Sequence, residues 1–138
     1  MYDDLEIKKM FNSIDGATLM DLNLPNTKFV IRDFLPQGLA IIGGSPKVGK
    51  SWLMLDWCVR IAKGETIWNF PTMKGTTLYV SLEDTASRLQ ERLLSVTDEA
   101  PNVFFTIFSF KIGEGLEEQI KSFVADHPGT ALIVIDTF

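Results

Sequence analysis

The sequence predicts a three-layer α/β fold, in which a mostly parallel sheet carries helices on both faces. Apolar runs typical of buried strands alternate with segments of helical periodicity, the order expected when helical crossovers join parallel strands. A glycine-rich octapeptide lies between one apolar run and one helical segment, as in many α/β proteins. Hydrophobic residues make up 46% of the 138 residues, which is enough to fill the core of one domain.

Charge and cysteine content limit the possible partners. The net charge is −5 at pH 7, so the chain has no general basic surface, and any contact with DNA has to be local or lie outside these residues. The single cysteine, Cys58, lies among apolar residues, which favours a buried thiol in a reducing, cytoplasmic compartment. No signal pattern opens the chain, and no apolar run approaches about 18 residues, so we expect no membrane contact.

The first part of the chain is expected to lie outside the main domain. We expect residues 1–27 to form a short helix and a connector, and residues 28–138 to form the domain itself. The domain is expected to begin with an extended segment and a turn at residues 36–38. The N-terminal helix is indicated by one apolar face at helical spacing: Ile7, Met10, Phe11 and Ile14.

The octapeptide fits the P-loop pattern G-x-x-x-x-G-K-[ST]. Apolar residues 39–42 before it predict a buried strand, and residues 52–62 after it predict a helix, so the pattern has the context in which it binds phosphate. Loop N–H groups and the positive end of the helix would face the phosphate oxygens. This context disfavours the alternative, a glycine-rich turn without a ligand. The predicted nucleotide-binding residues are Gly44, Ser45, Pro46, Lys47, Val48, Gly49, Lys50, Ser51 and Trp52.

Three side chains of the loop have different expected roles. Lys50 would reach the β- and γ-phosphates of ATP and is a predicted catalytic residue. The Ser51 hydroxyl would ligate Mg²⁺, so ATP and Mg²⁺ are the expected cofactors. We interpret Lys47, the other lysine of the loop, as solvated rather than catalytic.

A second apolar run, residues 77–82, predicts a strand that ends directly on Glu83 and Asp84. Carboxylates at the carboxyl end of a parallel strand lie on the side of the sheet where α/β proteins bind ligands. A helix is predicted to follow, and Asp84 or Thr85 would cap it. We favour capping for Asp84 and catalysis for Glu83.

The rest of the chain predicts two more strands and one more helix. Residues 102–110 form a nearly continuous apolar run that is typical of a buried strand, and residues from Leu116 onward have the spacing of an amphipathic helix. His127 is interpreted as a turn residue that ends this helix, not as a ligand.

The last apolar run, residues 131–136, ends in Asp136 and has the Walker B pattern, so Asp136 would hold Mg²⁺ beside Ser51. Four strands and three helical crossovers are expected in total.

These motifs together resemble those of the RecA-like P-loop ATPases. More narrowly, they are similar to those of the RepA-type hexameric replicative helicases of plasmids and phages and their AAA-annotated relatives. The resemblance spans about residues 28–138, and its most specific part is a strand that ends in Leu-Glu-Asp, followed by Arg-Leu-x-x-Arg-Leu. It rests on five segments: Leu35–Gly38, Gly43–Leu53, Leu78–Asp84, Arg88–Leu93 and Leu132–Thr137.

The resemblance implies a function and site roles. It implies ATP hydrolysis by a homo-oligomeric motor in DNA replication or recombination of a mobile element, with Glu83 as the general base. The residue after Asp136 is Thr137 rather than a second acid, which agrees with a base located elsewhere. Two other interpretations stay open: a nucleotide-dependent regulatory or assembly switch without helicase activity, and a small-molecule phosphotransferase. An arginine-rich lid would favour the phosphotransferase, and none is evident in the sequence.

The resemblance also implies that this chain corresponds to the N-terminal half of such a motor, truncated after the Walker B strand. Relatives continue for about another hundred residues with a sensor strand, DNA-contacting loops and an arginine finger, so DNA would be bound through regions beyond residue 138. One later strand would lie between the P-loop strand and the Walker B strand. We expect the gap to be closed by direct strand pairing, from this chain or from another copy.

Overall fold

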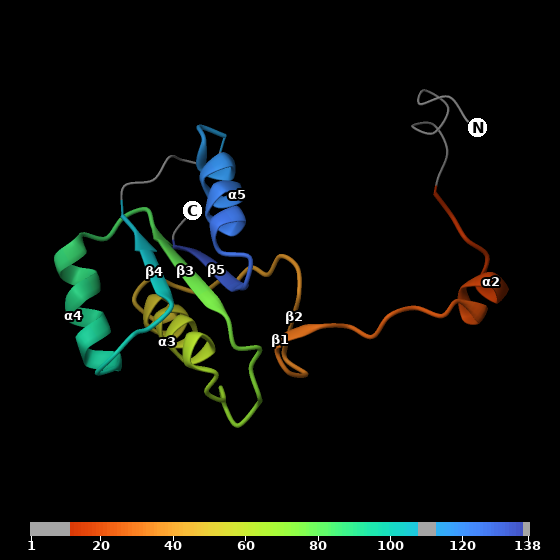
Figure 1. The fold of residues 1–138 in the computed structure, drawn as a ribbon, viewed down its shortest axis with the longest axis horizontal. Helices are drawn as coiled ribbons and strands as arrows, with labels where there is room; N and C mark the ends of the chain where they lie inside the picture. Colours follow the sequence, from red (N-terminus) through yellow and green to blue (C-terminus); the bar gives the residue numbers. More distant parts are fainter. Residues whose placement is uncertain (1–11, 108–112, 137–138) are drawn as a thin grey trace.

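A parallel three-stranded sheet forms the centre of the domain. The computed structural model describes residues 12–107 and 113–136. The strand order in the sheet is β4-β3-β5, and β3 pairs in parallel with both neighbours (Figure 1). The strands are β3 (Thr76–Ser81), β4 (Val103–Thr106) and β5 (Thr130–Asp136), and the helices around them are α3 (Lys50–Lys63), α4 (Ala86–Val96) and α5 (Leu116–Asp126).

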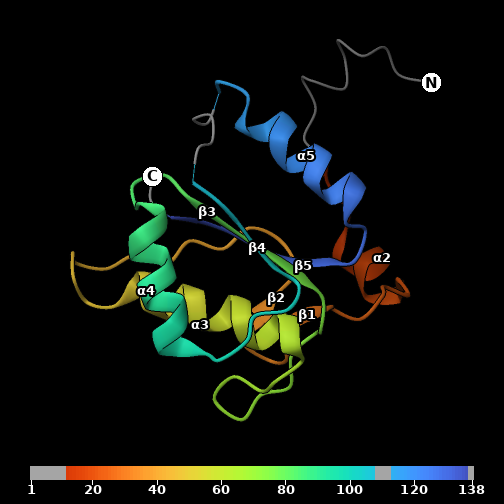
Figure 2. The same cartoon turned by 60° about the vertical axis from the view of Figure 1, so that its left-hand side comes forward.

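Helices cover both faces of this sheet because side chains of β3 alternate between them. Tyr79 packs with Leu55 of α3 and Leu89 of α4 on one face, whereas Leu78 and Val80 pack against α5 on the other. Figures 1 and 2 show α5 on the side of the sheet opposite α3 and α4. The α/β prediction, with a parallel sheet and helices on both faces, is therefore confirmed.

The interior of α3 agrees with the interpretation of Cys58 as a buried residue. Cys58 is fully buried between α3 and the sheet, and burial raises the pKa of its thiol to about 12. The thiol is thus protonated and inert at neutral pH. The helix ends at Gly64, whose φ of 75° is the left-handed conformation expected of a helix stop.

A separate antiparallel pair precedes the P-loop. β1 (Phe29–Ile31) pairs with β2 (Leu35–Pro36), and its residues Val30 and Ile31 form a buried cluster with Trp57 of α3. A short helix, α2 (Gly16–Asp21), begins after its cap Asp15 and lies away from the sheet (Figure 1).

The predicted N-terminal helix is only partly comparable with the structure. Ile7, Met10 and Phe11 lie outside the described residues, and Ile14 precedes α2 instead of forming part of its face. The apolar residues of α2 are exposed, with Met20 at 86%, because no described element packs on them. Residues 108–110 of the predicted third strand also lie outside the described residues.

The prediction of a strand before the P-loop is wrong. Residues 39–42 have no strand conformation, and Leu39 and Ile41 are 90% and 79% exposed. A strand exists only where a neighbour accepts its backbone hydrogen bonds, and within the described chain no strand lies beside this segment. In the part of the chain that the structure describes, the sheet therefore has three strands instead of the expected four.

The expected closure of the gap by strand pairing is not seen among the described residues. Among the described residues, β5 pairs only with β3, and a cavity of about 620 Å³ lies between residues 39–43 and β5. Closure by another copy stays a prediction.

One glycine is required where β3 begins beside β5. A Cβ atom on Gly75 would lie 2.5 Å from the carbonyl oxygen of Gly129 and 2.8 Å from the Cβ of Ala131. We expect Gly75→Ala to lower the free energy of unfolding by about 1–3 kcal/mol, because the strands would have to separate. Chemical denaturation would measure this loss. Gly129→Ala is the matched control, since nothing lies within 4 Å of its Cβ position; equal stability of the two variants would contradict the prediction.

Candidate nucleotide-binding site

The P-loop curls into the first turn of α3. Lys47 has a φ of 63° and Gly49 a φ of 99°, and these left-handed residues turn the chain into the helix that begins at Lys50. Within the described chain, no backbone N–H from Gly43 to Gly49 donates to another backbone group. Several exposed donors thus gather at the positive end of a 14-residue helix, which is an arrangement that binds phosphate.

The ammonium group of Lys50 lies inside the curl of the loop. Its Nζ donates to the carbonyl oxygen of Gly44 and, at 3.3 Å, to that of Ser45. These carbonyls hold the cation at the mouth of the loop, where phosphate oxygens would replace them as its partners. Lys47 and Val48 are exposed, which agrees with a solvated Lys47.

Two hydroxyl groups converge on the carboxylate that ends β5. Ser51 Oγ donates to Asp136 Oδ2 at 2.6 Å, and the hydroxyl of Tyr79 donates to the same oxygen. The structure thereby brings together Ser51 and Asp136, which lie 85 positions apart in the sequence. Burial, together with the bond to Asp136, raises the pKa of the Tyr79 phenol, so the hydroxyl stays a donor at neutral pH.

Sequence reasoning missed Tyr79. The only available signal was strand alternation: residues 77, 79 and 81 share one face of β3, and Asp136 belongs to the neighbouring strand of a predicted parallel sheet. That signal does not identify a contact, because the strand order and register were unknown.

The oxygen atoms of Ser51 and Asp136 fit a magnesium ion. Mg²⁺ prefers oxygen ligands, keeps several waters and is commonly held by one or two protein groups plus phosphates. A hydroxyl and a carboxylate at hydrogen-bond distance, beside the P-loop, form such a donor pair. Within residues 12–107 and 113–136, no three His, Cys, Asp or Glu side chains form a metal cluster, so an all-protein cage is not part of this site.

Glu83 follows the carboxyl end of β3, one strand from Asp136. Its side chain is exposed and forms no ion pair within the described part of the chain. Ser81 fixes the turn next to it, since Ser81 Oγ accepts from the N–H of Asp84 at 3.1 Å.

The favoured capping role of Asp84 is wrong. Thr85 is the N-cap of α4 and accepts from the N–H of Arg88 at 3.3 Å. Asp84 instead pairs with Arg92 at 2.6 Å and with Arg88 at 3.6 Å, because residues 88 and 92 lie on the helix face that returns toward the turn. The pair with Arg92 is largely buried, with side-chain exposures of 13% and 19%.

Arg92 also connects α4 to the residue after the P-loop. Its guanidinium carbon lies 5.8 Å from the centre of the Trp52 ring, within the range of a cation–π contact. Trp52 is 44% exposed and thus accessible to a ligand.

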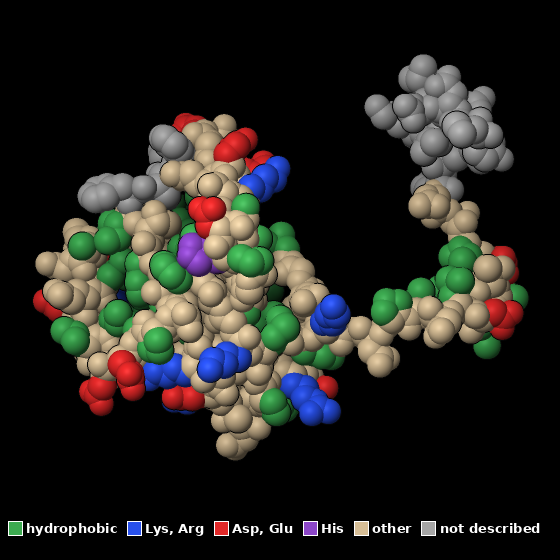
Figure 3. All heavy atoms as spheres, viewed as in Figure 1, with side chains coloured by type: hydrophobic (Ala, Val, Ile, Leu, Met, Phe, Trp, Pro, Cys, Tyr) green, Lys and Arg blue, Asp and Glu red, His purple; other side chains and the backbone are tan. Residues whose placement is uncertain are grey.

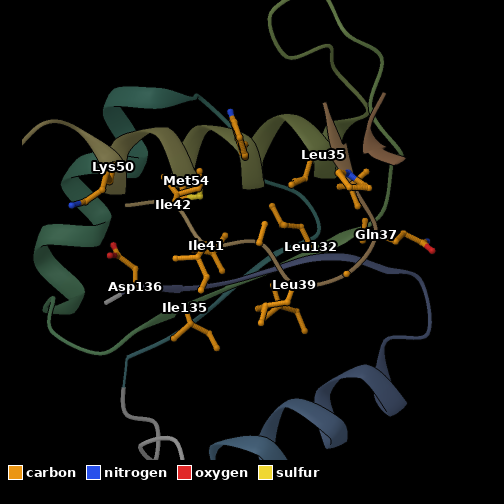
Figure 4. Close-up of a pocket in the computed structure, with 18 of the residues that line it drawn as sticks. Leu35, Gln37, Leu39, Ile41, Ile42, Lys50, Met54, Leu132, Ile135 and Asp136 are labelled. Carbon is orange, nitrogen blue, oxygen red and sulfur yellow. The ribbon is translucent and has the colours of Figure 1, made fainter. Parts of the chain in front are cut away.

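The cavity beside β5 has a polar end and an apolar body (Figure 4). Lys50 and Asp136 lie near one another at one end, and Gln37 lies at the other end. Between them, side chains of residues 39–42, Met54 and Leu132 form an apolar lining. The polar end carries the residues that the sequence predicts for phosphate and Mg²⁺.

The comparison with protein families matches residues 10–138 to the family described as AAA domain. The chain belongs to the AAA domain family. Membership indicates nucleotide-dependent ATPase activity, for which AAA domains generally use ATP and Mg²⁺. No curated protein and no solved structure matches the chain.

Among the described residues, no helix is both long enough and apolar enough to span a membrane.

Proposed function

We propose that this protein binds and hydrolyses ATP as a RecA-like, helicase-type motor in DNA replication or recombination of a mobile element. The observation that carries the proposal is the convergence of the P-loop residues Lys50 and Ser51 with Asp136 at the carboxyl end of the sheet. In the proposed motor, residues 28–138 form the N-terminal part of the ATPase domain, and residues 1–27 form a helix and a connector.

Each site residue has one role in this proposal. Lys50 binds the β- and γ-phosphates, and the loop N–H groups from Gly44 to Gly49 bind the remaining phosphate oxygens. Ser51 and Asp136 would hold Mg²⁺, which when bound neutralises phosphate charge. Glu83 accepts a proton from the attacking water, because it is an exposed carboxylate without an ion-pair partner in the described chain.

The DNA role rests on sequence resemblance, whose most specific segment is the Leu-Glu-Asp turn with the arginines that follow it. The Leu-Glu-Asp turn and the two arginines that follow it form one connected unit, in which Asp84 bonds Arg92 and Arg92 contacts Trp52. This unit joins the turn that carries Glu83 to the start of α3.

Strand unwinding and DNA-stimulated turnover test the motor function. We expect the full-length protein to hydrolyse ATP faster with single-stranded DNA and to separate a tailed duplex in an ATP-dependent reaction. A Lys50→Ala variant controls for contaminating activity. ATP hydrolysis without any response to DNA would contradict the helicase function and leave the nucleotide site intact.

The second candidate, a nucleotide-dependent regulatory or assembly switch, is favoured by the charge of the chain. The net charge is −5, and on the face shown in Figure 3 the lysines and arginines are interspersed with acidic side chains instead of forming one basic surface. A switch would change its oligomeric state between ATP and ADP without unwinding DNA. Light scattering in ATP and in ADP measures the oligomeric state. A switch would differ between the two nucleotides, whereas a motor would keep the same oligomer throughout ATP hydrolysis.

A further inference from the structure

Three hydroxyl side chains form a buried row on the α3-facing side of β3. Thr77, Tyr79 and Ser81 are exposed by 1% or less. A buried hydroxyl lowers stability unless it is hydrogen-bonded, and each of these has a partner. Thr77 donates to the carbonyl oxygen of Cys58 in α3, and Ser81 accepts from the N–H of Asp84. Only the middle hydroxyl, that of Tyr79, reaches a carboxylate of the candidate site.

The register of the sheet explains why a tyrosine makes this contact. Tyr79 is paired with Val134 and Ser81 with Asp136, so Tyr79 and Asp136 are diagonal neighbours on adjacent strands. Diagonal Cβ atoms lie about 7–8 Å apart, a separation that only a long side chain spans. The Tyr79 ring packs among apolar side chains and lies 5.9 Å from the ring of Phe105. A phenylalanine ring would fill the same space, so packing alone does not require the hydroxyl.

Both hydroxyl donors meet at one oxygen of Asp136. Ser51 approaches Oδ2 from the start of α3, and Tyr79 approaches it from the neighbouring strand. A carboxylate held by two donors on different elements has little freedom to rotate about its own side-chain bonds. Fixing it beforehand avoids the entropy that would otherwise be lost when a cation binds.

We propose that Tyr79 is a positioning residue, whose hydroxyl holds Asp136 in the orientation that binds the nucleotide-associated Mg²⁺. The inference rests on the proposed function of Ser51 and Asp136 as the metal-binding pair. Loss of a group that orients a metal ligand commonly weakens metal affinity by about 10–100-fold. Among the described residues, the Tyr79 hydroxyl donates to Asp136 and not to the P-loop, so we expect its loss to affect the metal and not the phosphate contacts.

A Mg²⁺ titration of the nucleotide complex tests the role of Tyr79. The full-length protein is saturated with a fluorescent ADP analogue in EDTA, and Mg²⁺ is then added while fluorescence is recorded. In Tyr79→Phe, we expect the half-saturating Mg²⁺ concentration to rise by about tenfold or more, since the positioning bond is lost. Affinity for the analogue in EDTA should stay within about twofold of wild type.

Turnover gives a second measurement. Tyr79→Phe should raise the Mg²⁺ concentration for half-maximal ATP hydrolysis, and saturating Mg²⁺ should restore most of the rate. A lowered rate that no Mg²⁺ concentration restores, with an unchanged half-saturating value, would overturn the positioning role.

Thr77→Val is the matched control. It removes a buried hydroxyl from the same face of the same strand, but this hydroxyl bonds a helix carbonyl and does not reach the site. If Tyr79 is only structural, the two variants lose similar thermal stability and neither changes the Mg²⁺ titration, which would overturn the inference. Circular dichroism of both variants checks folding. A second comparison, Tyr79→Phe in an Asp136→Asn background, should show no further weakening of Mg²⁺ binding.

Ser51→Ala distinguishes this inference from the proposed function. Weaker Mg²⁺ binding in Ser51→Ala but not in Tyr79→Phe would overturn the role of Tyr79 and support the metal-binding pair. If neither variant changes the titration, both the metal-binding pair and the inference are wrong.

Discussion

Replacing Lys50 with alanine should weaken binding of a non-hydrolysable ATP analogue with Mg²⁺ by about 30-fold or more. The ammonium group lies inside the curl of the P-loop, where, among the described residues, it donates to the carbonyl oxygens of Gly44 and Ser45. Charge-assisted hydrogen bonds to phosphate are worth roughly 2 kcal/mol or more, which corresponds to that change in affinity. Isothermal titration calorimetry of the full-length protein measures it directly.

Lys47→Ala is the control for this experiment. Lys47 belongs to the same loop and carries the same charge, but its side chain is exposed. We expect its removal to change affinity by less than about threefold, because screened surface charges contribute little. Equal affinities of the wild type and Lys50→Ala would show that the loop does not bind phosphate through this residue.

The features that were predicted correctly from the sequence are those that depend on residues close together in the sequence. The P-loop turn follows from glycine at position 49 and a helix that begins at Lys50. Asp136 lies beside it, as expected of an acid at the carboxyl end of a parallel strand, where α/β proteins bind ligands. Helices α3, α4 and α5 each follow from apolar residues at helical spacing and from recognisable ends. The proximity of Ser51 and Asp136 could therefore be predicted although the strand order was unknown.

The errors concern properties that depend on distant partners. Residues 39–42 have a strand-like composition, but a strand needs a neighbour, and the described chain supplies none. Asp84 has the right type and position for a cap, yet Arg92, eight positions later, competes successfully for its carboxylate. The contact between Tyr79 and Asp136 depends on sheet register, which the sequence pattern does not fix.

Replacing Glu83 with glutamine should lower the rate of ATP hydrolysis by about 10²-fold or more and leave ATP binding nearly unchanged. The glutamine amide keeps the shape of the side chain but cannot accept a proton, and general-base catalysis contributes about 10²–10⁴-fold. Glu83 occupies the turn after β3, one strand from Asp136, and its carboxylate is exposed without an ion-pair partner in the described chain. Steady-state turnover together with calorimetric ATP affinity measures the two quantities separately.

Glu91→Gln is the matched control for Glu83→Gln. Glu91 is also an exposed glutamate close to this part of the fold, but it lies on α4, past the turn that Ser81 and Asp84 fix. We expect its removal to change turnover by less than about twofold, since an exposed helix carboxylate outside the site contributes little. If Glu83→Gln turns over ATP as fast as Glu91→Gln, Glu83 is not the base, and another carboxylate must activate the water. If Glu83→Gln loses ATP affinity and turnover equally, its role is in binding, because a residue that acts only in the transition state lowers the rate and leaves binding unchanged.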